Sequence, residues 1–353
     1  MSVSAVDRAI ATYRRHCAEK GVACTGEFNR VSLPTRLSTE RGMECLSDAL
    51  VLSGEWLVLT EGHIALDHFA ARGLAPSSLY VAGGTPDRRV LIHDRPISSG
   101  VDSAFLLGGV ANYAHWLLDT IPLLAYYGRV PSGTPIVVHK GLLGFQKESL
   151  AALEVPERLL LPLDEPGAYR FPHLWFPALA SAVYLPPLTL RAEVLMWLRD
   201  RLLRGGELAR GGRRLYVSRR SQSEDRQRLR NDEEVAADLA RHGFETVMPE
   251  ELTFLQQVSL FSDAEIVVAP HGAGLANCVF APRSCKVIEM VGTLTDSWLK
   301  PGMIFEAMFA ALGQRHRRVV GDGLWRDVPQ GSLVLYEPYS MPPERIRAAL
   351  ASL

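Results

Sequence analysis

Beyond residue 212, short apolar strands alternate with helical segments, and this alternation constrains the fold more than any other feature of the sequence. Helical patterns of the 3.6-residue kind separate runs that are almost entirely Val, Ile and Leu. Such runs are typical of a parallel sheet covered by helices on both faces. We therefore predict a Rossmann-like α/β domain. Its strands are expected at residues 215–217, 245–248, 266–269, 287–290 and 318–320, and its helices at residues 232–241, 252–261, 273–280 and 304–312.

The first half of the chain shows two patterns in succession. Apolar residues at helical spacing come first, and Gly21 marks the end of the helix that they predict. Short β-type runs separated by Gly and Pro residues follow, as in a meander of hairpins. From residue 104 the pattern changes to strand, helix and strand. The helix is expected at residues 6–17, the β-type runs at 49–52, 56–59, 79–81 and 90–92, and the later elements at 104–107, 111–127, 136–138 and 190–203.

The length of 353 residues is enough for two domains of ordinary size. Glycine pairs between residues 205 and 212 mark a boundary. We predict a fold with two Rossmann-like domains facing a central cleft, the first extended by the N-terminal β-meander. The N-terminal, acceptor-side domain would cover residues 1–205, the C-terminal Rossmann-like domain 206–330, and a tail and helix over 331–353 would pack back on the N-terminal domain.

Composition places the chain among globular proteins and argues against nucleic acid as a partner and against a membrane span. Hydrophobic residues make up 47% of the chain, and the formal net charge is -1, so no global charge attracts nucleic acid. The arginine-rich stretch over residues 210–230 contains no aromatic stacking motif. Five cysteines without CxxC spacing indicate reduced thiols, and no apolar run is long enough to span a membrane. We expect a cytoplasmic protein, with peripheral membrane association through a partner left open.

The turn that follows the predicted strand over residues 266–269 is the strongest candidate site. Its residues His271, Gly272, Ala273, Gly274 and Leu275 lie at the carboxyl end of that strand and open the next helix. Ligands bind at this edge of open α/β sheets, and free N–H groups at a helix start favour an anion. The alternative is that the glycines serve only a tight strand-to-helix turn. The strand, turn and helix context favours a phosphate site, with His271 as an additional ligand.

Charged residues at neighbouring strand ends supply further candidates. Arg219 and Arg220 follow the strand over residues 215–217, and a guanidinium matches phosphate oxygens bidentately. Arg228 is a weaker candidate in the same loop. Glu289 lies in the next strand, where it could bind ribose hydroxyls or simply be a solvent-exposed strand-end residue. Asn231 fits a helix N-cap, and we favour that structural reading.

A polar stripe marks the predicted helix over residues 111–127. Asn112, His115 and Asp119 have the spacing i, i+3 and i+7, which places them on one face of an α-helix. Buried polar groups must be hydrogen-bonded or functional, so a satisfied core histidine remains the alternative. His115 and Asp119 are candidates for a general base. Pro122 predicts a kink or a new helical start soon after Asp119.

Three blocks of sequence together resemble glycosyltransferase family 61, which includes plant xylosyl- and arabinosyltransferases and animal O-linked N-acetylglucosaminyltransferases. The similarity covers roughly residues 100 to 292, and residues 1–95 carry no match. Two departures are residues 283–285, where the family usually has a Pro-Gly turn, and Asp232, where Glu is usual. The blocks are Asn-Tyr-Ala-His-Trp-Leu-Leu-Asp-Thr-Ile-Pro at 112–122, Leu-Tyr-Val-Ser-Arg-Arg at 215–220 with Arg228 and Asn-Asp-Glu at 231–233, and Pro-His-Gly-Ala-Gly-Leu-Ala-Asn at 270–277 with Phe280 and Val-Ile-Glu at 287–289.

The resemblance implies a GT-B-like pair of domains and an inverting, metal-independent sugar transfer, here in a bacterial member. UDP is the default nucleotide. The donor would be bound by the arginines, by the 271–275 turn with Asn277, and by Glu289, while Asn112 and Trp116 would lie on the acceptor side. The sequence contains no Asp-x-Asp pair, which metal-dependent transferases use, so we expect neither a metal nor another cofactor. Asp119 or His115 would act as the base.

The predicted function is transfer of a sugar to a hydroxyl of a glycan or lipid-linked glycan, in polysaccharide biosynthesis. The main alternative is a non-catalytic protein that binds a nucleotide-sugar or a glycan. A hydrolase or phosphatase that uses His271 is less well supported, because the sequence lacks a G-x-S-x-G elbow and any metal-ligand spacing of His and Cys.

Overall fold

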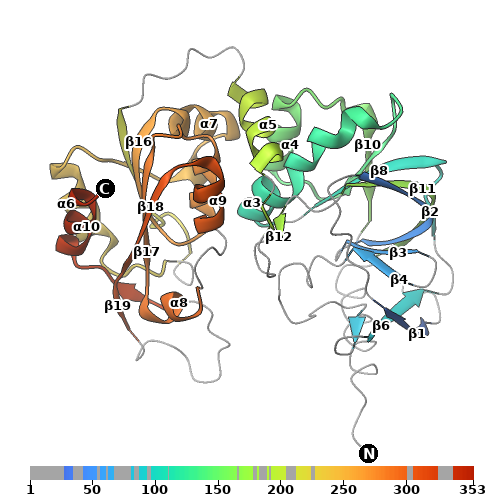
Figure 1. Ribbon diagram of the computed structural model, residues 1–353, viewed down its shortest axis with the longest axis horizontal. Helices are drawn as coiled ribbons and strands as arrows, with labels where there is room; N and C mark the ends of the chain where they lie inside the picture. Colours follow the sequence, from blue (N-terminus) through green and yellow to red (C-terminus); the bar gives the residue numbers. More distant parts are fainter. Residues whose placement is uncertain are drawn as a thin grey trace, which may run out of the picture. The chain divides into compact units, whose positions relative to one another are not determined.

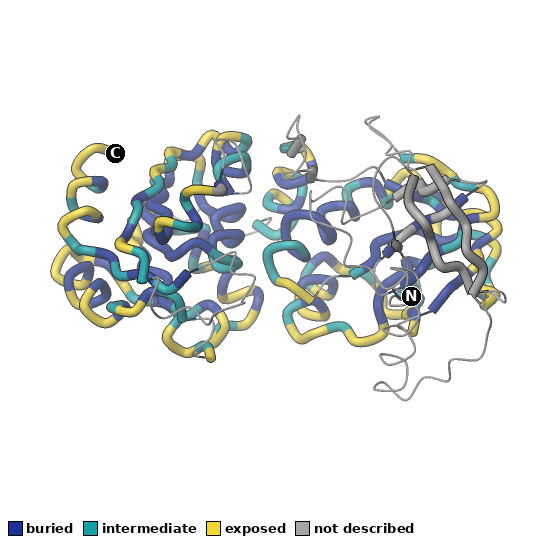
Figure 2. The backbone as a smooth tube through the Cα atoms, turned by 90° about the horizontal axis from the view of Figure 1, so that it is seen from below, coloured by how far each residue is buried: buried dark blue, intermediate teal, exposed yellow. Residues whose placement is uncertain are grey.

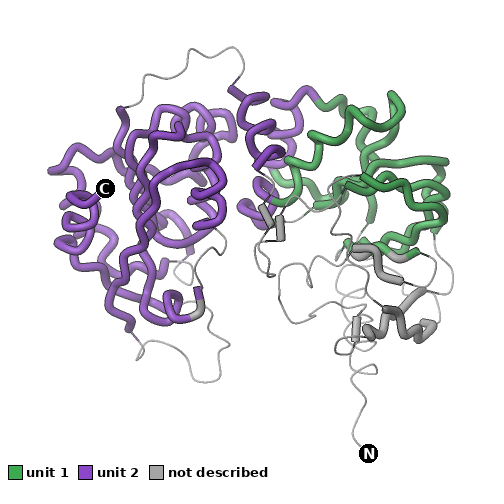
Figure 3. Tube along the Cα trace, viewed as in Figure 1, with its two compact units in different colours: residues 1–111, 119–143, 155–189 green, residues 112–118, 144–154, 190–353 purple. Residues whose placement is uncertain are grey.

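The computed structural model forms two compact units, each of which is described by itself (Figure 3). Unit 1 contains residues 1–111, 119–143 and 155–189, and unit 2 contains residues 112–118, 144–154 and 190–353. The predicted helix over residues 6–17 and the glycines at 205, 206 and 211 lie outside the described residues. The structure describes residues 28–34, 43–53, 56–60, 63–66, 81–82, 87–93, 97–109, 111–164, 167–177, 181–182, 189–190, 192–203, 212–223, 227–299, 305–324 and 337–353.

Unit 1 is built on one mixed sheet that joins the two patterns seen in the sequence. The strand order is β10-β9-β8-β11-β2-β3-β4, and β7 also pairs with β11. Pairing is parallel from β10 to β11 and antiparallel from β11 to β4, so the hairpin meander continues the parallel part. The strands are β2 (Met43–Ser53), β3 (Leu57–Thr60), β4 (His63–Leu66), β7 (Ile97–Ser98), β8 (Ser103–Gly108), β9 (Ile136–His139), β10 (Leu160–Leu163) and β11 (Gly167–Pro177).

Smaller elements complete unit 1. Strands β1 (Phe28–Pro34), β5 (Val81–Ala82) and β6 (Asp87–His93) form a separate antiparallel sheet, so the last two predicted runs of the meander leave the main sheet. A second small sheet pairs β12 (Ser181–Ala182) with β13 (Thr189–Leu190). The single turn η3 (Glu157–Leu159) precedes β10.

The predicted helix over residues 111–127 is divided into three helical types. It begins as α3 (Tyr113–His115), continues as a π-helix, η1 (Trp116–Thr120), and ends as a 3-10 helix, η2 (Ile121–Arg129). Pro122 has no N–H group to donate to the carbonyl four residues earlier, so a regular α-helical ladder cannot run through this point. The α-helical spacing that placed Asn112, His115 and Asp119 on one face therefore does not apply.

Unit 2 contains the predicted parallel sheet. Five strands in the order β15-β14-β16-β17-β18 pair in parallel throughout. Each predicted strand is present, with ends shifted by a few residues. The strands are β14 (Arg213–Val217), β15 (Glu245–Val247), β16 (Ala264–Pro270), β17 (Lys286–Val291) and β18 (Arg315–Val320).

Helices cover both faces of this sheet, as the apolar strands predicted (Figure 1). Their buried side chains are largely aliphatic and aromatic, and Figure 2 shows the buried sheet between more exposed helices. On one side α6 (Asp232–Arg241) and α10 (Pro343–Ala351) pack together against the strands. Against the other face lie α7 (Phe254–Ser262), η6 (Ala273–Val279) and α9 (Phe305–Leu312), and α5 (Ala192–Leu203) packs on these three helices. The remaining short elements lie in connections: η5 (Pro249–Glu251), α8 (Thr293–Trp298), β19 (Asp322–Gly323) and β20 (Tyr339–Ser340).

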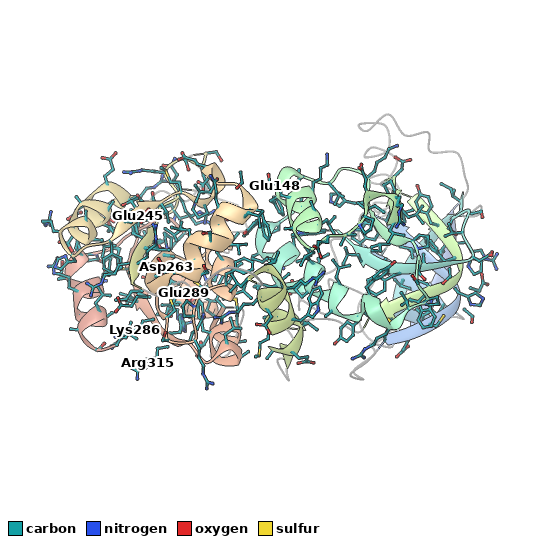
Figure 4. All side chains as sticks on the ribbon, turned by 90° about the horizontal axis from the view of Figure 1, so that it is seen from above. Glu148, Glu245, Asp263, Lys286, Glu289 and Arg315 are labelled. Atoms are coloured by element: carbon teal, nitrogen blue, oxygen red, sulfur yellow. The ribbon has the colours of Figure 1, made fainter. Side chains whose placement is uncertain are left out.

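The units differ from the predicted domains in three respects. The last stretch of unit 2 begins at residue 190, so α5 belongs to unit 2 and not to the predicted domain over residues 1–205. Unit 2 also includes residues 112–118 and 144–154, where α4 (Gly144–Ala152) packs on α7 and its Glu148 carboxylate accepts the Phe254 N–H at 2.6 Å (Figure 4). The C-terminal tail also packs within unit 2, not on an N-terminal domain as expected. Ile346 of α10 is buried in the core of this unit, and Asn231 bonds the Met341 backbone in both directions, at 2.9 and 3.0 Å.

Candidate functional site

The turn after β16 has a backbone arranged to accept an anion. The His271 N–H donates a hydrogen bond to the Met290 carbonyl at 2.8 Å, and the Leu275 N–H donates one to the Gly272 carbonyl at 3.0 Å. The N–H groups of Gly272, Ala273 and Gly274 donate no hydrogen bond to any of the described residues. These three residues are partly exposed. Three adjacent donors at the carboxyl edge of the sheet favour a negatively charged ligand.

Strand β14 explains why two glycines are needed in this turn. Tyr216 pairs with Val268, so Arg219 and His271 each follow three residues later at the same edge. A Cβ on Gly272, where φ is +157°, would lie 2.7 Å from Nη1 of Arg219. A Cβ on Gly274 would lie 3.1 Å from Cγ1 of Val217. The glycines therefore let the end of β14 pack onto the turn, with the Arg219 guanidinium over Gly272. The sequence predicted only that both residues lie at this edge of the sheet.

Polar contacts within the loop after β14 hold Arg219. Its Nη2 donates to Oε1 of Gln222 at 3.0 Å. Gln227 ties the loop together, because its Nε2 donates to the Arg220 carbonyl at 2.9 Å and to the Gln222 carbonyl at 2.5 Å. Arg220 is exposed, and Arg228 is partly buried. The loop thus fixes Arg219 beside the turn and leaves Arg220 in solvent.

Asp232 supports the same strand end from α6. Its buried carboxylate accepts hydrogen bonds from the Tyr216 hydroxyl at 2.8 Å and from the Ser218 hydroxyl at 2.7 Å. The preceding Asn231 occupies the predicted N-cap position, but its side chain bonds Met341 and makes no cap hydrogen bond. Both residues serve to fix the frame around Arg219.

Glu289 occupies a different environment from the one predicted. Its side chain is 2% exposed, and its two oxygens are hydrogen-bonded to Nδ1 of His271 and, at 2.9 Å, to Nε2 of His316. Figure 4 shows it within the parallel sheet of unit 2. Burial alone would raise the pKa of Glu289, but hydrogen bonds and charge from the two histidines lower it to about 2. Glu289 is thus an ionised, buried partner of His271, which argues against direct ribose binding.

The sequence analysis did not identify the C-terminal segment over residues 337–341 as part of this edge. The Tyr339 hydroxyl donates to the Met290 carbonyl at 3.1 Å, the same carbonyl that the His271 N–H bonds. The Tyr339 N–H donates to the Arg228 carbonyl at 2.9 Å. Burial raises the pKa of the Tyr339 hydroxyl, on which the charges of Arg219, Glu289 and Arg228 also act. No motif in the sequence connects this segment with the turn.

Glu337 is a second buried carboxylate of that segment. It is 0% exposed, and one oxygen accepts the Leu294 N–H. Gly292 and Gly323 leave room for its carboxylate. A Cβ on Gly292 would lie 2.8 Å from Oε1, and a Cβ on Gly323 would lie 2.5 Å from Oε2. Its Oε2 has no hydrogen-bond partner among the residues that the structure describes. Glu337 thus packs between Gly292, which follows β17, and Gly323 of β19, and it bonds the start of α8.

Two predicted donor-binding side chains lie in the interior instead. Leu275 and Asn277 are both 0% exposed. Asn277 accepts a hydrogen bond from the Tyr113 hydroxyl at 2.5 Å and donates to Oε1 of Gln257 at 2.9 Å. Burial of both side chains does not favour a direct contact with a ligand, and donor binding by Leu275 and Asn277 stays a prediction.

The residues of the predicted acceptor side are also placed differently. Trp116 is 0% exposed, and its indole N–H donates to the Ser149 hydroxyl at 2.9 Å. Asn112 caps α3 by accepting the His115 N–H at 3.2 Å. Trp116 is thus a core residue and Asn112 an exposed helix cap, and the acceptor-side role of either residue stays a prediction.

The two candidate bases fall in different units. Helix α3, with His115, packs on η6 in unit 2, the unit that carries the anion turn. His115 is partly exposed there. Asp119 belongs to unit 1 and is 8% exposed. His115 therefore lies in the same unit as the anion turn, whereas the sequence placed it in the opposing domain.

Two classes of feature are not found in the described part of the chain. No group of three or more His, Cys, Asp or Glu residues there could hold a metal ion. Among those same residues, no helix has both the length and the apolar character needed to cross a membrane.

Comparison with known proteins matches the region that carries this geometry. The model of one protein family, described as Glycosyltransferase 61, matches residues 113–288, about half of the chain. The match begins at α3, includes Arg219 and the anion turn, and ends in β17. A search of curated proteins finds no match.

Proposed function

Because the chain belongs to glycosyltransferase family 61, we propose that it transfers a sugar from a nucleotide-diphosphate sugar, by default a UDP-sugar, to an acceptor hydroxyl. The observation that carries this proposal is the Arg219 guanidinium over Gly272, beside the N–H groups of Gly272, Ala273 and Gly274. The leaving group of such a transfer is a nucleoside diphosphate. Fixed donors and a permanent positive charge stabilise the negative charge that develops on it.

The proposed reaction is a single in-line displacement that inverts the anomeric carbon. The acceptor oxygen forms a bond to that carbon while the bond to the diphosphate oxygen breaks, and a base takes the acceptor proton. Arg219, the turn N–H groups and His271 would receive the diphosphate. The absence of an Asp-x-Asp pair from the sequence supports a metal-independent reaction.

His115 and Asp119 remain the proposed bases. His115 is partly exposed in α3, which packs on the helix that follows the anion turn. Asp119 is more buried and lies in the π-helical turn, a conformation that is frequent at functional sites. A GT-B-like pair of α/β domains, a glycan or lipid-linked glycan acceptor, a role in polysaccharide synthesis and a cytoplasmic location belong to the same proposal.

The test is a thermal-shift screen of nucleoside diphosphates and nucleotide-sugars, each with and without chelator. A ligand that binds the native state raises the melting temperature, so we expect stabilisation by UDP or a UDP-sugar that chelator does not remove. Arg219→Ala should lose the shift. Arg214→Ala is the matched control, because Arg214 is an exposed arginine near the start of the same strand, bonded to the His242 carbonyl.

Two results would contradict parts of the proposal. No shift with any nucleotide contradicts the donor site, and a shift that chelator abolishes contradicts the metal-free mechanism. Product formation from a labelled donor then separates an enzyme from the alternative, a non-catalytic protein that binds a nucleotide-sugar or a glycan.

A further inference from the structure

A pocket of about 680 Å³ lies at the amino edge of the unit 2 sheet, opposite the edge that carries the anion turn. It is bounded by the later turns of α5, by the end of α9 and by the loop before β17. Because β17 and β18 are parallel, this loop and the end of α9 meet at the same edge. The volume is in the range of small-molecule sites in proteins.

Two arginines line this pocket without an acidic partner. Arg199 of α5 is partly buried, and Arg283 of the loop before β17 is exposed. Within the described part of the chain, neither guanidinium forms a hydrogen bond or an ion pair. Arg318 of the same unit, by contrast, pairs with Asp296 at 2.8 Å. The pocket therefore contains two permanent cations with donors that no described residue uses.

The charges around Arg199 favour the entry of an anion. Burial lowers the pKa of Arg199, and the charge of Asp200 offsets this effect only in part. Asp200 is exposed, and it is the one carboxylate among the described residues that line the pocket. Two guanidinium groups thus face a single carboxylate. A ligand with an anionic group would supply the missing negative charge and accept the unused hydrogen bonds.

Gly313 determines where Arg283 lies. It follows α9 with φ +68°, and a Cβ there would lie 2.6 Å from Nε of Arg283. The arginine therefore lies across the end of α9, where a cation could simply neutralise the helix dipole. Two carbonyls of that end are already bonded, because the Gly313 N–H donates to Ala310 at 3.1 Å and the Gln314 N–H to Phe309 at 2.9 Å. Arg283 bonds no carbonyl among the described residues, so its donors are not used as a cap.

The remaining lining of the pocket is largely apolar. Met196 of α5 is 51% exposed, and Leu203, Ala310 and Ala311 line the same pocket. An exposed methionine beside arginine stems offers contact area to an aliphatic group. Guanidinium groups match phosphate oxygens bidentately. The combination fits a phosphate that carries an aliphatic group.

We propose that this pocket is a second anion site, which binds the phosphate group of an aliphatic phosphate compound through Arg199 and Arg283. The phosphate oxygens accept hydrogen bonds from both guanidinium groups, and the aliphatic part lies against Met196 and the alanines of α9. A membrane phospholipid and a soluble phosphate ester both present this chemistry. The site lies at the opposite edge of the sheet from the anion turn, so it does not depend on the proposed function.

The test uses the unmodified full-length protein and two probes. Butyl phosphate is titrated while the melting temperature is followed, because a ligand of the native state raises it. Vesicles of phosphatidylcholine alone, or of phosphatidylcholine and phosphatidylglycerol in equal parts, are sedimented with the protein. Phosphate salts also stabilise proteins without a specific site, so every result is compared with variants. We expect butyl phosphate to raise the melting temperature, and a membrane lipid as ligand would add binding to the vesicles with phosphatidylglycerol.

Variants assign the binding to the two arginines. Arg283→Gln and Arg199→Gln should each weaken it roughly tenfold or more, because a charged donor is lost. Arg283→Lys keeps the charge but loses the planar fork, so it should bind with intermediate strength. Arg214→Gln is the matched control, since it removes an exposed arginine of unit 2 outside the pocket, and it should bind normally. Arg219→Ala should keep the part of the shift that Arg283→Gln removes.

Each outcome supports the inference or overturns it. Binding of either probe that both glutamine variants lose supports the site; loss with butyl phosphate alone indicates a soluble ester, and loss with the vesicles indicates a membrane lipid. If neither probe binds, or if both variants bind like Arg214→Gln, the inference is wrong. A lower melting temperature of Arg283→Gln with unchanged binding would assign this arginine to the end of α9.

Two features keep this test decisive and separate from the proposed function. If Arg199→Gln does not fold, Arg283→Gln still decides, because that position is exposed. The UDP-induced shift tests the donor site at the other edge of the sheet. Failure of UDP to bind with normal binding of butyl phosphate would contradict only the proposed function.

Discussion

The Arg219 guanidinium lies directly over the backbone of Gly272, so close that a Cβ on that glycine would be 2.7 Å from Nη1. The two residues are 53 positions apart in the sequence, counted from 219 to 272. Parallel pairing of β14 with β16 brings them to the same edge. The contact joins a permanent cation to a turn in which the N–H groups of residues 272–274 have no hydrogen-bond partner within the described part of the chain, and it explains why the turn needs glycine at this position.

Gly272→Ala should displace Arg219 and weaken donor binding. The variant should also lose about 1–3 kcal/mol of stability, because φ near +157° is unfavourable for residues with a Cβ. The measurement is the UDP-induced shift in melting temperature together with urea unfolding. Gly144→Ala at the start of α4 is the control, since a Cβ there meets nothing within 4 Å. An unchanged UDP shift in Gly272→Ala would show that the position of Arg219 does not matter.

Asn277→Ala should reduce stability without changing the affinity for UDP. Asn277 is buried and joins Tyr113 to Gln257, so its loss leaves buried polar groups unpaired at a cost of about 1–3 kcal/mol. Urea unfolding and UDP titration of the folded protein separate the two effects. Gln257→Ala breaks the same chain of hydrogen bonds and should behave alike. A selective loss of UDP affinity in Asn277→Ala would instead indicate that Asn277 binds the nucleotide-sugar.

Glu289 should contribute an acid-dependent part of the stability. Its folded-state pKa is lowered from 4.5 to about 2, so its contribution is complete above the unfolded value and is lost as the pH falls toward the folded value. A shift of this size corresponds to about 3 kcal/mol. The free energy of unfolding is measured against pH for the unmodified protein and Glu289→Gln. The difference should be largest above pH 4.5 and shrink toward pH 2; a constant difference would contradict the shift.

Replacement of the true base should lower turnover more than donor binding. We expect either His115→Gln or Asp119→Asn to reduce kcat by about 10²- to 10⁴-fold, the usual contribution of general base catalysis. The UDP-induced shift should stay near normal in that variant. Lys147→Ala, at an exposed position of α4 in unit 2, is the control and should keep normal turnover. If both candidate variants kept near-normal turnover, the base would have to be another residue.

The sequence was sufficient to predict the parallel sheet of unit 2 and the location of its anion turn. Buried parallel strands are continuous apolar runs, and the turn between β16 and η6 follows directly from two glycines after such a run. Arg219 could be placed at the same edge because the carboxyl ends of parallel strands lie together. These features are local or follow from a regular repeat.

Burial and long-range partners could not be predicted in the same way. Glu289 stands between apolar residues in β17. Only the pairing of β17 with β16 and β18 shows that its carboxylate bonds His271 and His316. The family resemblance implied that Trp116 lies on the acceptor side and that Asn277 binds the donor. Packing of η6 and α4 around them turned both into core residues, because their hydrogen-bond partners come from other elements.

By itself, the sequence determined which segments form strands and helices in unit 2 and where phosphate chemistry is expected. The tertiary structure alone decided that residues 112–118 and the C-terminal segment over 337–341 belong with that sheet. It also decided that Glu289 bonds imidazoles and lies away from solvent. The physical reason is that the apolar periodicity of a segment shows which of its faces is buried. It does not show which other segment covers that face, because this depends on strand order and on packing between residues far apart in the sequence.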